Sequence, residues 1–503
     1  METREVLAAA TPSGTAEADG LARLAGQVRR DLALLNHPPA AWTLPATGPD
    51  GRPALDVLVV GAGMCGQTAA FALLREGISN LRVVDRSARG AEGPWGTFAR
   101  METLRSPKHL TGPDLGIPSL TFRAWYEAQA GDAGWRDLTK IPRLDWLRYL
   151  LFVRDAAGIP VENGVAVTAL SPVQAPVPAP AEGTAGGLIA AALDGPAGPE
   201  TVFCRKVVLA CGREGSGGRR LPELGGTGGA RLLHAADPID FAALRGSRVA
   251  VLGASASAVD NAATALEAGA AEVTLFVRRR HFPQVNTSKW ASFPGFLRGY
   301  AALDDGGRWR FMTRIMAAGT PPPHESVLRC TRHPGFRIRF GEGWTGVSEG
   351  PDGFVVETAR GRYPVEAAIV ATGFDVDLVQ RPELAAFRDA ILTWGDRVAP
   401  DEAAAHPEAA RFPYLGDGME LRERSPGTMP SLGRLHVFNW GVTLSHGALA
   451  GDIPGLGIGA TRLAQAVVRD LFVSDAARHA ERMRAHEDDE LAPTPYFVPR
   501  EAR

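Results

Sequence analysis

The chain has 503 residues, a formal net charge of −2, 45% hydrophobic residues and 22% charged residues. This length exceeds what one hydrophobic core supports, so we expect two to three domains. A net charge so close to zero excludes a general affinity for nucleic acid or for anionic membranes. The four cysteines are too few and too scattered for a disulfide framework, and the sequence has no Cys-x-x-Cys pair.

The sequence shows no recognisable signal peptide and no run of about twenty apolar residues that would span a membrane. We therefore expect a cytoplasmic enzyme. Residues 1–50 form an N-terminal extension, in which apolar residues at helical spacing predict a helix over 20–35. We expect this helix to pack on the main body, and a docking arm or a subunit contact is the alternative.

Residues 56–66 form a predicted buried strand that enters a Gly-x-Gly-x-x-Gly turn. A predicted helix over 68–76 and a second strand over 81–85 complete a strand–turn–helix–strand unit. Such a unit holds the pyrophosphate of a dinucleotide at the N-terminus of its helix, because unpaired N–H groups and the positive end of the helix dipole meet there.

The three glycines of this turn have separate roles. Gly61 makes the turn, Gly63 lets the backbone approach the pyrophosphate, and Gly66 lets the helix pack closely on the strand. Asp85 ends the second strand, where an acid bonds ribose hydroxyls and repels a 2′-phosphate. The unit is therefore predicted to bind FAD or NAD rather than NADP, through Gly61, Gly63, Met64, Gly66, Asp85 and Arg86.

After this unit the chain becomes irregular and rich in proline, before a predicted helix that begins near Asp145. Strand-like segments alternate with turns over 161–209, and the Ala-, Pro- and Gly-rich piece over 171–199 predicts a hairpin with a loose tip. Residues 207–212 end this block as a short buried strand that runs into a glycine. A similar phrase returns at 368–373.

A second strand–turn–helix unit lies between these two phrases, over 248–260, with a closing strand over 273–277. Ser255 replaces the middle glycine of the motif, and its hydroxyl and that of Ser257 are predicted to bond phosphate. The closing strand is followed by Arg278, Arg279 and Arg280, whose guanidinium groups suit a 2′-phosphate; a solvated basic strand end is the alternative. This unit is predicted to bind NADPH, not NADH, through Gly253, Ser255, Ser257, Arg278 and Arg279.

Two such units predict an α/β fold with two Rossmann-like dinucleotide-binding domains and doubly wound parallel sheets. The simplest topology is an FAD domain that is interrupted by an NADPH domain. The FAD domain then covers 51–240 and 365–503, and the NADPH domain covers 241–364 with an inserted substrate segment over 284–340. The last predicted helix runs over 459–471.

Five elements, in order and spacing, resemble the class B flavin-containing monooxygenases, a superfamily that includes N-hydroxylating and Baeyer–Villiger enzymes. The resemblance covers about residues 54–472. It rests on the first Gly turn, a Gly-x-Trp phrase, the loop before Asp114, the second Gly turn and an Ala-Thr-Gly-Phe phrase, at 61–66, 93–95, 104–108, 253–260 and 371–374. The piece over 228–234 keeps the family's histidine, His234, but lacks its Phe and Gly, so the exact subclass is left open. We expect His234 to be a domain-linker contact rather than a chemical group.

The resemblance implies FAD and NADPH as cofactors and O2 as cosubstrate. NADPH reduces the flavin, the reduced flavin forms a C4a-(hydro)peroxyflavin with O2, and bound NADP+ shields it while oxygen passes to a small molecule. Nitrogen or sulfur is the predicted acceptor, and a Baeyer–Villiger reaction on a ketone is the close alternative. A different enzyme class is an NADPH–flavin reductase that inserts no oxygen, which the missing cysteine pair disfavours. A nucleotide-bound sensor is a further, non-catalytic hypothesis.

The resemblance also implies which residues lie near the flavin. Lys108 and Asp114 fall in the loop that approaches the isoalloxazine in relatives, and they are the predicted catalytic residues. Trp95 is expected to pack either on the cofactor or in the core. The segment over 451–455 is expected to aim the last helix at the flavin or to be a simple turn. The remaining predicted cofactor contacts are Thr372, Gly373 and Asp452.

The predicted substrate segment is rich in aromatic residues and proline, and a basic cluster lies near its end. The cluster is expected to bind an anionic substrate or to form the exposed edge of a strand, and it consists of Arg329, Arg332, His333, Arg337 and Arg339. Histidines and cysteines show no metal-ligand spacing, so no metal is predicted. The expected partners are a small-molecule substrate and O2, and a homodimer is common among similar proteins.

Overall fold

The computed structural model describes residues 15–110, 112–173, 187–222, 232–350 and 353–502. Its first sheet has a parallel part in the order β4-β3-β2-β7, and β18 adds to β7 in parallel. Strands β6 and β5 extend the sheet in antiparallel fashion, and β1 pairs with β2. The strands are β1 (Ala46–Thr47), β2 (Pro53–Val60), β3 (Leu81–Asp85), β4 (Val161–Asn163), β5 (Ala166–Pro172), β6 (Ile189–Gly195), β7 (Gly198–Leu209) and β18 (Leu435–Val437).

The second sheet is parallel throughout, in the order β12-β11-β10-β16-β9. Two of its strands, β9 and β16, lie outside 241–364, the range predicted for the NADPH domain, so the sheet extends beyond that range on both sides. The division of the chain into domains stays a prediction. The strands are β9 (Leu232–His234), β10 (Arg248–Leu252), β11 (Glu272–Val277), β12 (Phe336–Phe340) and β16 (Ala367–Val370).

Two small antiparallel sheets complete the strand inventory of the described residues. One packs on the second sheet through a shared apolar cluster, and the other joins the two halves of the chain. The first is formed by β13 (Trp344–Gly350), β14 (Gly353–Thr358) and β15 (Gly361–Val365), and the second by β8 (Gly217–Arg219) and β17 (Phe374–Val376).

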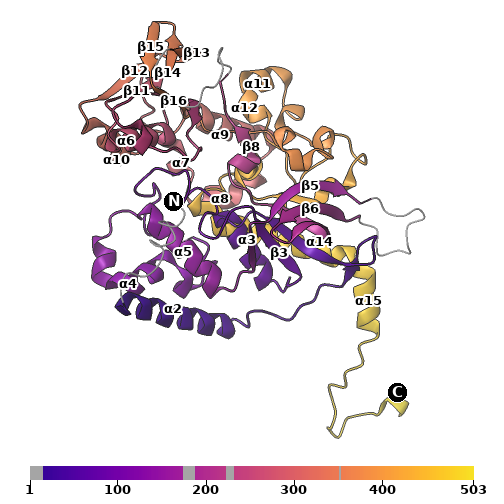
Figure 1. The fold of residues 1–503 in the computed structure, drawn as a ribbon. Helices are drawn as coiled ribbons and strands as arrows, with labels where there is room; N and C mark the ends of the chain where they lie inside the picture. The colour runs from indigo at the N-terminus through magenta and orange to yellow at the C-terminus, as the bar shows by residue number, and fades with distance from the viewer. Residues whose placement is uncertain (1–14, 111, 174–186, 223–231, 351–352, 503) are drawn as a thin grey trace.

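Each glycine turn leads directly into a helix, and each of these helices has a helical neighbour: α3 packs against α14, and α6 packs against α10 (Figure 1). Strands β2 and β3 are almost wholly buried, as parallel strands covered on both faces should be. The helices are α2 (Thr15–Leu34), α3 (Met64–Arg75), α4 (Phe122–Asp137), α5 (Arg143–Ala156), α6 (Ala256–Glu267), α7 (Thr287–Trp290), α8 (Pro294–Gly299), α9 (Asp305–Ala318), α10 (His324–Thr331), α11 (Pro400–Ala405), α12 (Pro407–Ala410), α13 (Thr443–His446), α14 (Leu456–Ser474) and α15 (Ala476–Arg484).

The predicted elements are confirmed, with shifts at their ends. Strand β3 has the predicted bounds, whereas α3 begins four residues before the predicted start at 68, inside the glycine turn itself. The predicted hairpin over 171–199 is formed by β5 and β6. Its predicted loose tip, 174–186, lies outside the described residues.

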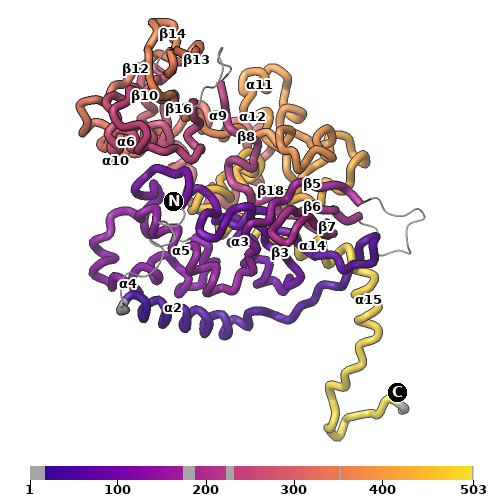
Figure 2. Tube along the Cα trace, in the orientation of Figure 1, coloured from indigo at the N-terminus to yellow at the C-terminus, as the bar shows by residue number. Residues whose placement is uncertain are grey.

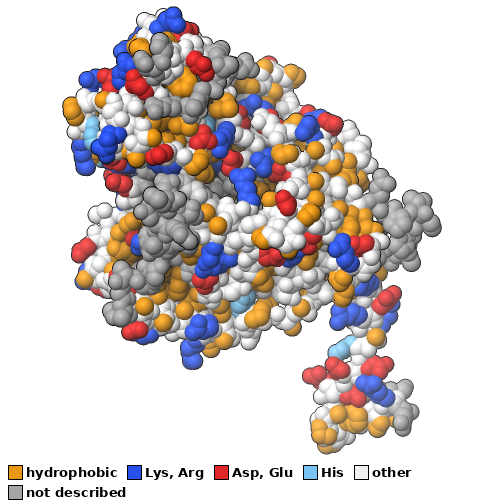
Figure 3. All heavy atoms as spheres, viewed as in Figure 1, with side chains coloured by type: hydrophobic (Ala, Val, Ile, Leu, Met, Phe, Trp, Pro, Cys, Tyr) orange, Lys and Arg blue, Asp and Glu red, His pale blue; other side chains and the backbone are white. Residues whose placement is uncertain are grey.

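The N-terminal helix packs on the main body, as expected. Val28 and Leu32 of α2 are buried in the main hydrophobic cluster, and Ser119 donates a hydrogen bond of 2.6 Å to Asp31. At the other end of the chain, α15 and the residues after it lead away from the body (Figure 2). No helix within the described ranges is long and apolar enough to cross a membrane. Acidic and basic side chains are interspersed over the face seen in Figure 3, in keeping with the small net charge.

Two buried histidines predict a loss of stability in acid. His436 and His446 bond backbone carbonyls of Gly418 and Gly416, and burial lowers the pKa of His436 to about 3 and that of His446 to about 4. Below pH 6.5 the two histidines therefore bind protons in the unfolded chain but stay neutral in the folded chain. The free energy of unfolding falls as the pH is lowered, until the pH reaches the pKa that each histidine has in the folded protein. The lowered pKa of His446 alone accounts for a loss of about 3 kcal/mol in the free energy of unfolding.

We expect the melting temperature to fall between about pH 6.5 and pH 4. The His446→Gln variant should show a shallower fall, relative to its own value at neutral pH, than the unmodified protein. Equal slopes for both proteins would contradict a buried, neutral His446.

Candidate functional site

The first glycine turn is closed on two sides and open on the third. Gly61 has φ +99°, and a Cβ there would lie 2.7 Å from the carbonyl oxygen of Ala210. A Cβ on Gly66 would overlap the carbonyl oxygen of Gly61. A Cβ on Gly63, the residue before α3, would meet no atom of the described residues closer than Gly93, at 3.8 Å. The backbone is therefore approachable at Gly63, where the pyrophosphate of a dinucleotide would meet the N-terminus of α3.

Asp85 holds the glycine turn in place. Its carboxylate accepts hydrogen bonds of 2.8 Å from the backbone N–H of Ala62 and of Ser87. A carboxylate oxygen has two acceptor sites, so each oxygen retains capacity for a ribose hydroxyl. The neighbouring Arg86 is largely exposed and pairs with Glu214 at 2.9 Å. Asp85 therefore has a structural role in the turn in addition to its predicted contact with the ribose.

The second glycine turn repeats this geometry. Gly253 has φ +150°, and a Cβ there would lie 2.5 Å from the carbonyl oxygen of Ala371. Ser255 and Ser257 are exposed at the start of α6, and neither hydroxyl bonds another group in the described part of the chain. Hydroxyls placed at a helix N-terminus without a protein partner fit a phosphate. These residues suit the second dinucleotide that the sequence predicts.

The two predicted phosphate-binding arginines differ in their surroundings. Arg279 donates to the carbonyls of Ala317 and Ala318 at 2.9 and 3.2 Å and so caps the C-terminus of α9. Arg278 is exposed and, among the described residues, has no hydrogen-bonded or ionic partner. The guanidinium of Arg278 is therefore available to a ligand, whereas that of Arg279 is committed to the fold.

The junction between the sheets is formed by residues of the late Ala-Thr-Gly-Phe phrase. Thr372 donates to the carbonyl of Arg220, and Gly373 accepts hydrogen bonds from Arg220 and from the ring of His234 at 2.9 and 3.1 Å. The His234 ring also packs edge-on against Phe374. His234 is thus a contact at the junction, as predicted, and Thr372 and Gly373 serve the same junction.

Lys108 and Asp114, the predicted catalytic pair, make contacts that belong to the fold. Lys108 donates to the carbonyls of Trp135 and Arg136 and lies 4.7 Å from the centre of the Trp135 ring, at the end of α4. Asp114 is buried, accepts 2.9 Å from the backbone of Gly116, and has its pKa raised by burial. Lys108 thus anchors its loop to α4, and a catalytic role for either residue stays a prediction.

Trp95 packs edge-on against the buried Trp146, with ring centroids 6.4 Å apart. This contact favours the core alternative over packing on a cofactor. In the segment before α14, the backbone N–H of Gly451 donates to Cys65 Sγ at 3.2 Å. Asp452 therefore lies beside the first turn of α3, next to the predicted pyrophosphate position.

The basic cluster near the end of the substrate segment is divided between the core and the sheet edge. Arg329 is buried and pairs with Glu267 at 2.6 Å. Arg337 and Arg339 point outward from β12, which is the edge strand of the second sheet. Both features favour the strand-edge alternative over an anion site. No group of three or more potential metal ligands occurs among the residues that the structure describes.

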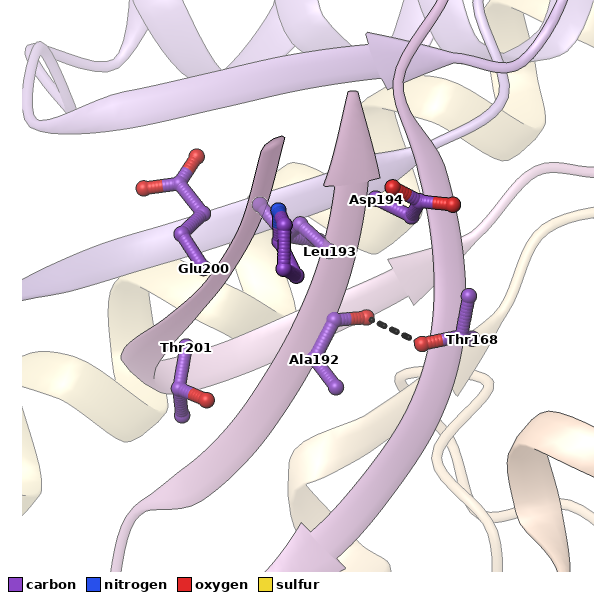
Figure 4. Close-up of a pocket in the computed structure, with 7 residues that line it drawn as sticks. Thr168, Ala192, Leu193, Asp194, Glu200 and Thr201 are labelled. Atoms are coloured by element: carbon purple, nitrogen blue, oxygen red, sulfur yellow. Dashed lines mark hydrogen bonds between the residues drawn. The ribbon is translucent and has the colours of Figure 1, made fainter. Parts of the chain in front are cut away.

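The cavity in Figure 4 lies on the antiparallel part of the first sheet. It has a volume of about 460 Å³, and the Thr168 hydroxyl donates to the carbonyl of Ala192 across it at 3.2 Å. None of its lining residues belongs to a glycine turn, so we assign no substrate to it. They are Thr168, Ala192, Leu193, Asp194, Pro199, Glu200 and Thr201.

Three residues near the first turn escaped sequence reasoning. Arg213 follows the strand phrase that ends at Gly212, and its guanidinium lies 3.6 Å from the centre of the Trp440 ring. Arg105 lies in the predicted flavin loop and donates to the carbonyl of Pro321 at 3.0 Å. The phrase around 207–212 signalled the strand, but nothing local signalled that Arg213 and Trp440 would meet.

Known proteins resemble the chain at the level of sequence and of fold. Residues 58–214 match a family described as FAD-NAD(P)-binding. The chain is 39% identical over 475 residues to FAD-dependent urate hydroxylase of Xanthomonas campestris pv. campestris, which covers 94% of this chain and 97% of that protein.

Two solved structures, a hydroxylase and a monooxygenase, share the fold. The reduced form of ornithine hydroxylase from Pseudomonas aeruginosa superposes with a TM-score of 0.65 at 14% identity, over 83% of this chain and 100% of that one. L-lysine 6-monooxygenase from Pseudomonas syringae gives a TM-score of 0.60 at 15% identity, over 82% and 99%.

These findings confirm the predicted two-nucleotide α/β fold and the predicted enzyme class. The first glycine turn, Asp85 and the strand phrase before Arg213 all lie inside the matched FAD-NAD(P)-binding segment. The predicted cofactor classes, a flavin and a nicotinamide dinucleotide, agree with that family. The chain therefore belongs to the FAD-dependent hydroxylase family, within the flavin monooxygenases, that is represented by the Xanthomonas urate hydroxylase.

Proposed function

We propose that the protein is an FAD- and NADPH-dependent monooxygenase that uses O2 to hydroxylate urate or a closely similar oxypurine. The observation that carries the proposal is the 39% identity with FAD-dependent urate hydroxylase, which extends over 97% of that protein. The aligned region spans 94% of this chain, so it includes both glycine turns and the predicted substrate segment over 284–340.

The geometry supports a division of labour between the two turns. Gly63 and the first turn of α3 would hold the FAD pyrophosphate, with Asp85 fixing the turn and bonding a ribose hydroxyl. Ser255, Ser257 and Arg278 would hold NADPH. Bound FAD supplies the redox chemistry and the activation of O2, so the protein's own residues bind, orient and exclude water.

Hydroxylation of urate balances with the same reactants as the predicted oxygenation of nitrogen or sulfur. Substrate, NADPH, a proton and O2 give hydroxylated substrate, NADP+ and water. The substrate and the fate of O2 therefore distinguish the alternatives. These are oxygen transfer to a heteroatom, oxygen insertion next to a ketone, and flavin reduction without oxygen insertion.

The test is NADPH oxidation and O2 uptake by the FAD-loaded protein with a panel of urate, ornithine, a dialkyl sulfide and a cyclic ketone. We expect urate to accelerate both rates and the other compounds to leave them at the background level. Acceleration by ornithine or the sulfide, with none by urate, would replace the proposal with heteroatom oxygenation. Acceleration by the ketone alone would indicate the Baeyer–Villiger reaction.

The 2′-phosphate assignment predicts a selective defect in the Arg278→Ala variant. Losing one charge-assisted hydrogen bond costs about 1.5–3 kcal/mol, so the KM for NADPH should rise roughly tenfold to a hundredfold. The KM for NADH should hardly change, because NADH has no 2′-phosphate. Steady-state kinetics with both nucleotides check this, and an equal rise in both KM values would contradict the assignment.

Arg279→Ala provides the matched comparison, because the Arg279 side chain caps α9. The Arg279→Ala variant should have a lower melting temperature than the unmodified protein, whereas the melting temperature of Arg278→Ala should not change.

A further inference from the structure

Arg213 leaves the first sheet at the edge where ligands bind in open α/β folds. It follows β7 by four residues, and the chain just before it, at Ala210, touches the first glycine turn. Ligands of such folds bind beyond the carboxyl ends of the parallel strands. The backbone therefore delivers the Arg213 side chain to the flavin-side edge of the sheet.

The guanidinium of Arg213 donates no hydrogen bond to any residue that the structure describes. The guanidinium stacks on the Trp440 ring at 3.6 Å from its centre, which fixes its plane. Its closest carboxylate oxygen belongs to Asp452, at 3.9 Å, which is beyond hydrogen-bond distance. The two side chains are 48% and 40% exposed. A planar fork of N–H donors and a carboxylate thus stand side by side with their bonding capacity free.

Arg105 brings a second positive charge to the same region. Its hydrogen bond to Pro321 ties the predicted flavin loop to the inserted substrate segment. Burial lowers the pKa of Arg105 and of Arg213, and the charges of Asp260, Asp452 and Arg213 act on Arg105. Arg105 therefore lies near enough to Arg213 and Asp452 for their charges to interact.

We propose that Arg213, held flat by Trp440 and adjacent to Asp452, forms with Arg105 a binding subsite for a planar anionic lactam such as urate. The inference rests on the proposed function and names the residues that recognise its substrate. Urate is an anion at neutral pH, and its ring edges alternate C=O acceptors with N–H donors. The Arg213 fork would donate to a carbonyl and a ring nitrogen, Asp452 would accept from a ring N–H, and Arg105 would balance the charge.

The hydrogen-bonding groups of this subsite discriminate between substrate classes. Arg213 and Arg105 donate and Asp452 accepts, whereas the nearby Asp260 accepts from Ser326 at 2.5 Å and lies 3.7 Å from Arg329. A cationic amine would meet repulsion from both arginines, and a neutral ketone would leave at least one of them unpaired. An anion with both donors and acceptors satisfies all three groups.

The experiment measures the Kd of urate for the FAD-loaded protein by isothermal titration calorimetry without NADPH, so that binding is separated from turnover. We expect Arg213→Gln and Arg105→Gln each to raise this Kd roughly tenfold or more. Arg213→Lys keeps the charge but loses the planar fork, so its Kd should lie between those of the unmodified protein and Arg213→Gln. FAD content and the KM for NADPH should stay unchanged in all three variants.

Arg337→Gln is the matched control, because Arg337 is an exposed arginine on β12, in the cluster that the sequence offered as an anion site. Its Kd for urate should equal that of the unmodified protein. A raised Kd in this variant, with unchanged values in the Arg213 and Arg105 variants, would overturn the inference. A failure of the proposed function shows in the unmodified protein, as urate that is not turned over, whereas a failure of the inference alone shows only in the variants.

Discussion

The Gly66→Ala variant is expected to lose FAD and to melt at a lower temperature, whereas Gly63→Ala loses FAD alone. A Cβ on Gly66 overlaps the backbone carbonyl of Gly61, which cannot move without opening the turn. Overpacking of this kind costs about 1–3 kcal/mol or more. A Cβ on Gly63 meets no atom of the described residues closer than 3.8 Å, so the fold tolerates it. It fills the gap that the pyrophosphate would occupy.

Two measurements separate the variants: FAD content after purification, and the melting temperature of protein from which the flavin has been removed. Both variants should be colourless. Only Gly66→Ala should melt earlier than the unmodified protein without flavin. A Gly63→Ala protein that retains its flavin would contradict the assignment of this turn to the FAD pyrophosphate.

Arg205→Met is expected to be the most destabilising single change outside the glycine turns. The buried Arg205 pairs with Asp56 at 3.2 Å and with Asp475 at 2.8 Å, and so joins β7, β2 and the end of α14. Without the guanidinium, two buried carboxylates have no cationic partner. Breaking a buried ion pair in this way lowers the free energy of unfolding by about 3–5 kcal/mol.

The stability loss in Arg205→Met is expected to depend on pH. Burial already raises the pKa of Asp56, and without Arg205 the carboxyl favours its neutral form still more. The Arg205→Met variant should therefore be less impaired near pH 5 than at about pH 8. Arg89→Met is the control, because the exposed Arg89–Asp155 pair contributes about 1 kcal/mol at most. Chemical denaturation at both pH values measures the losses, and equal losses in the two variants would contradict the buried network.

Local patterns predict the nucleotide units well, because a buried parallel strand and a glycine turn each consist of consecutive residues with a recognisable pattern. The strand over 81–85 and the roles of Gly61 and Gly66 follow from such runs, and the structure reproduces them. Helix α3 begins at Met64, four residues before the predicted start, since residues inside the glycine turn already have helical geometry.

The contacts that sequence reasoning missed join residues far apart in the chain. Arg205 meets partners 149 and 270 residues away, and no local pattern encodes that meeting. Lys108 lies in the predicted flavin loop, and the end of α4, about 27 residues further along the chain, supplies its hydrogen-bond acceptors. The Arg213–Trp440 stack likewise needs the whole first sheet to assemble before its two halves face each other.

The most direct test of the proposed monooxygenase activity uses urate, NADPH and ¹⁸O-labelled O2 with the FAD-loaded protein, followed by mass spectrometry of the product. We expect one labelled oxygen atom in the oxidised purine for each NADPH consumed, and the other atom in water. An unlabelled product, or NADPH oxidation in which all the consumed O2 appears as hydrogen peroxide, would show that the protein reduces its flavin without inserting oxygen and would contradict a monooxygenase.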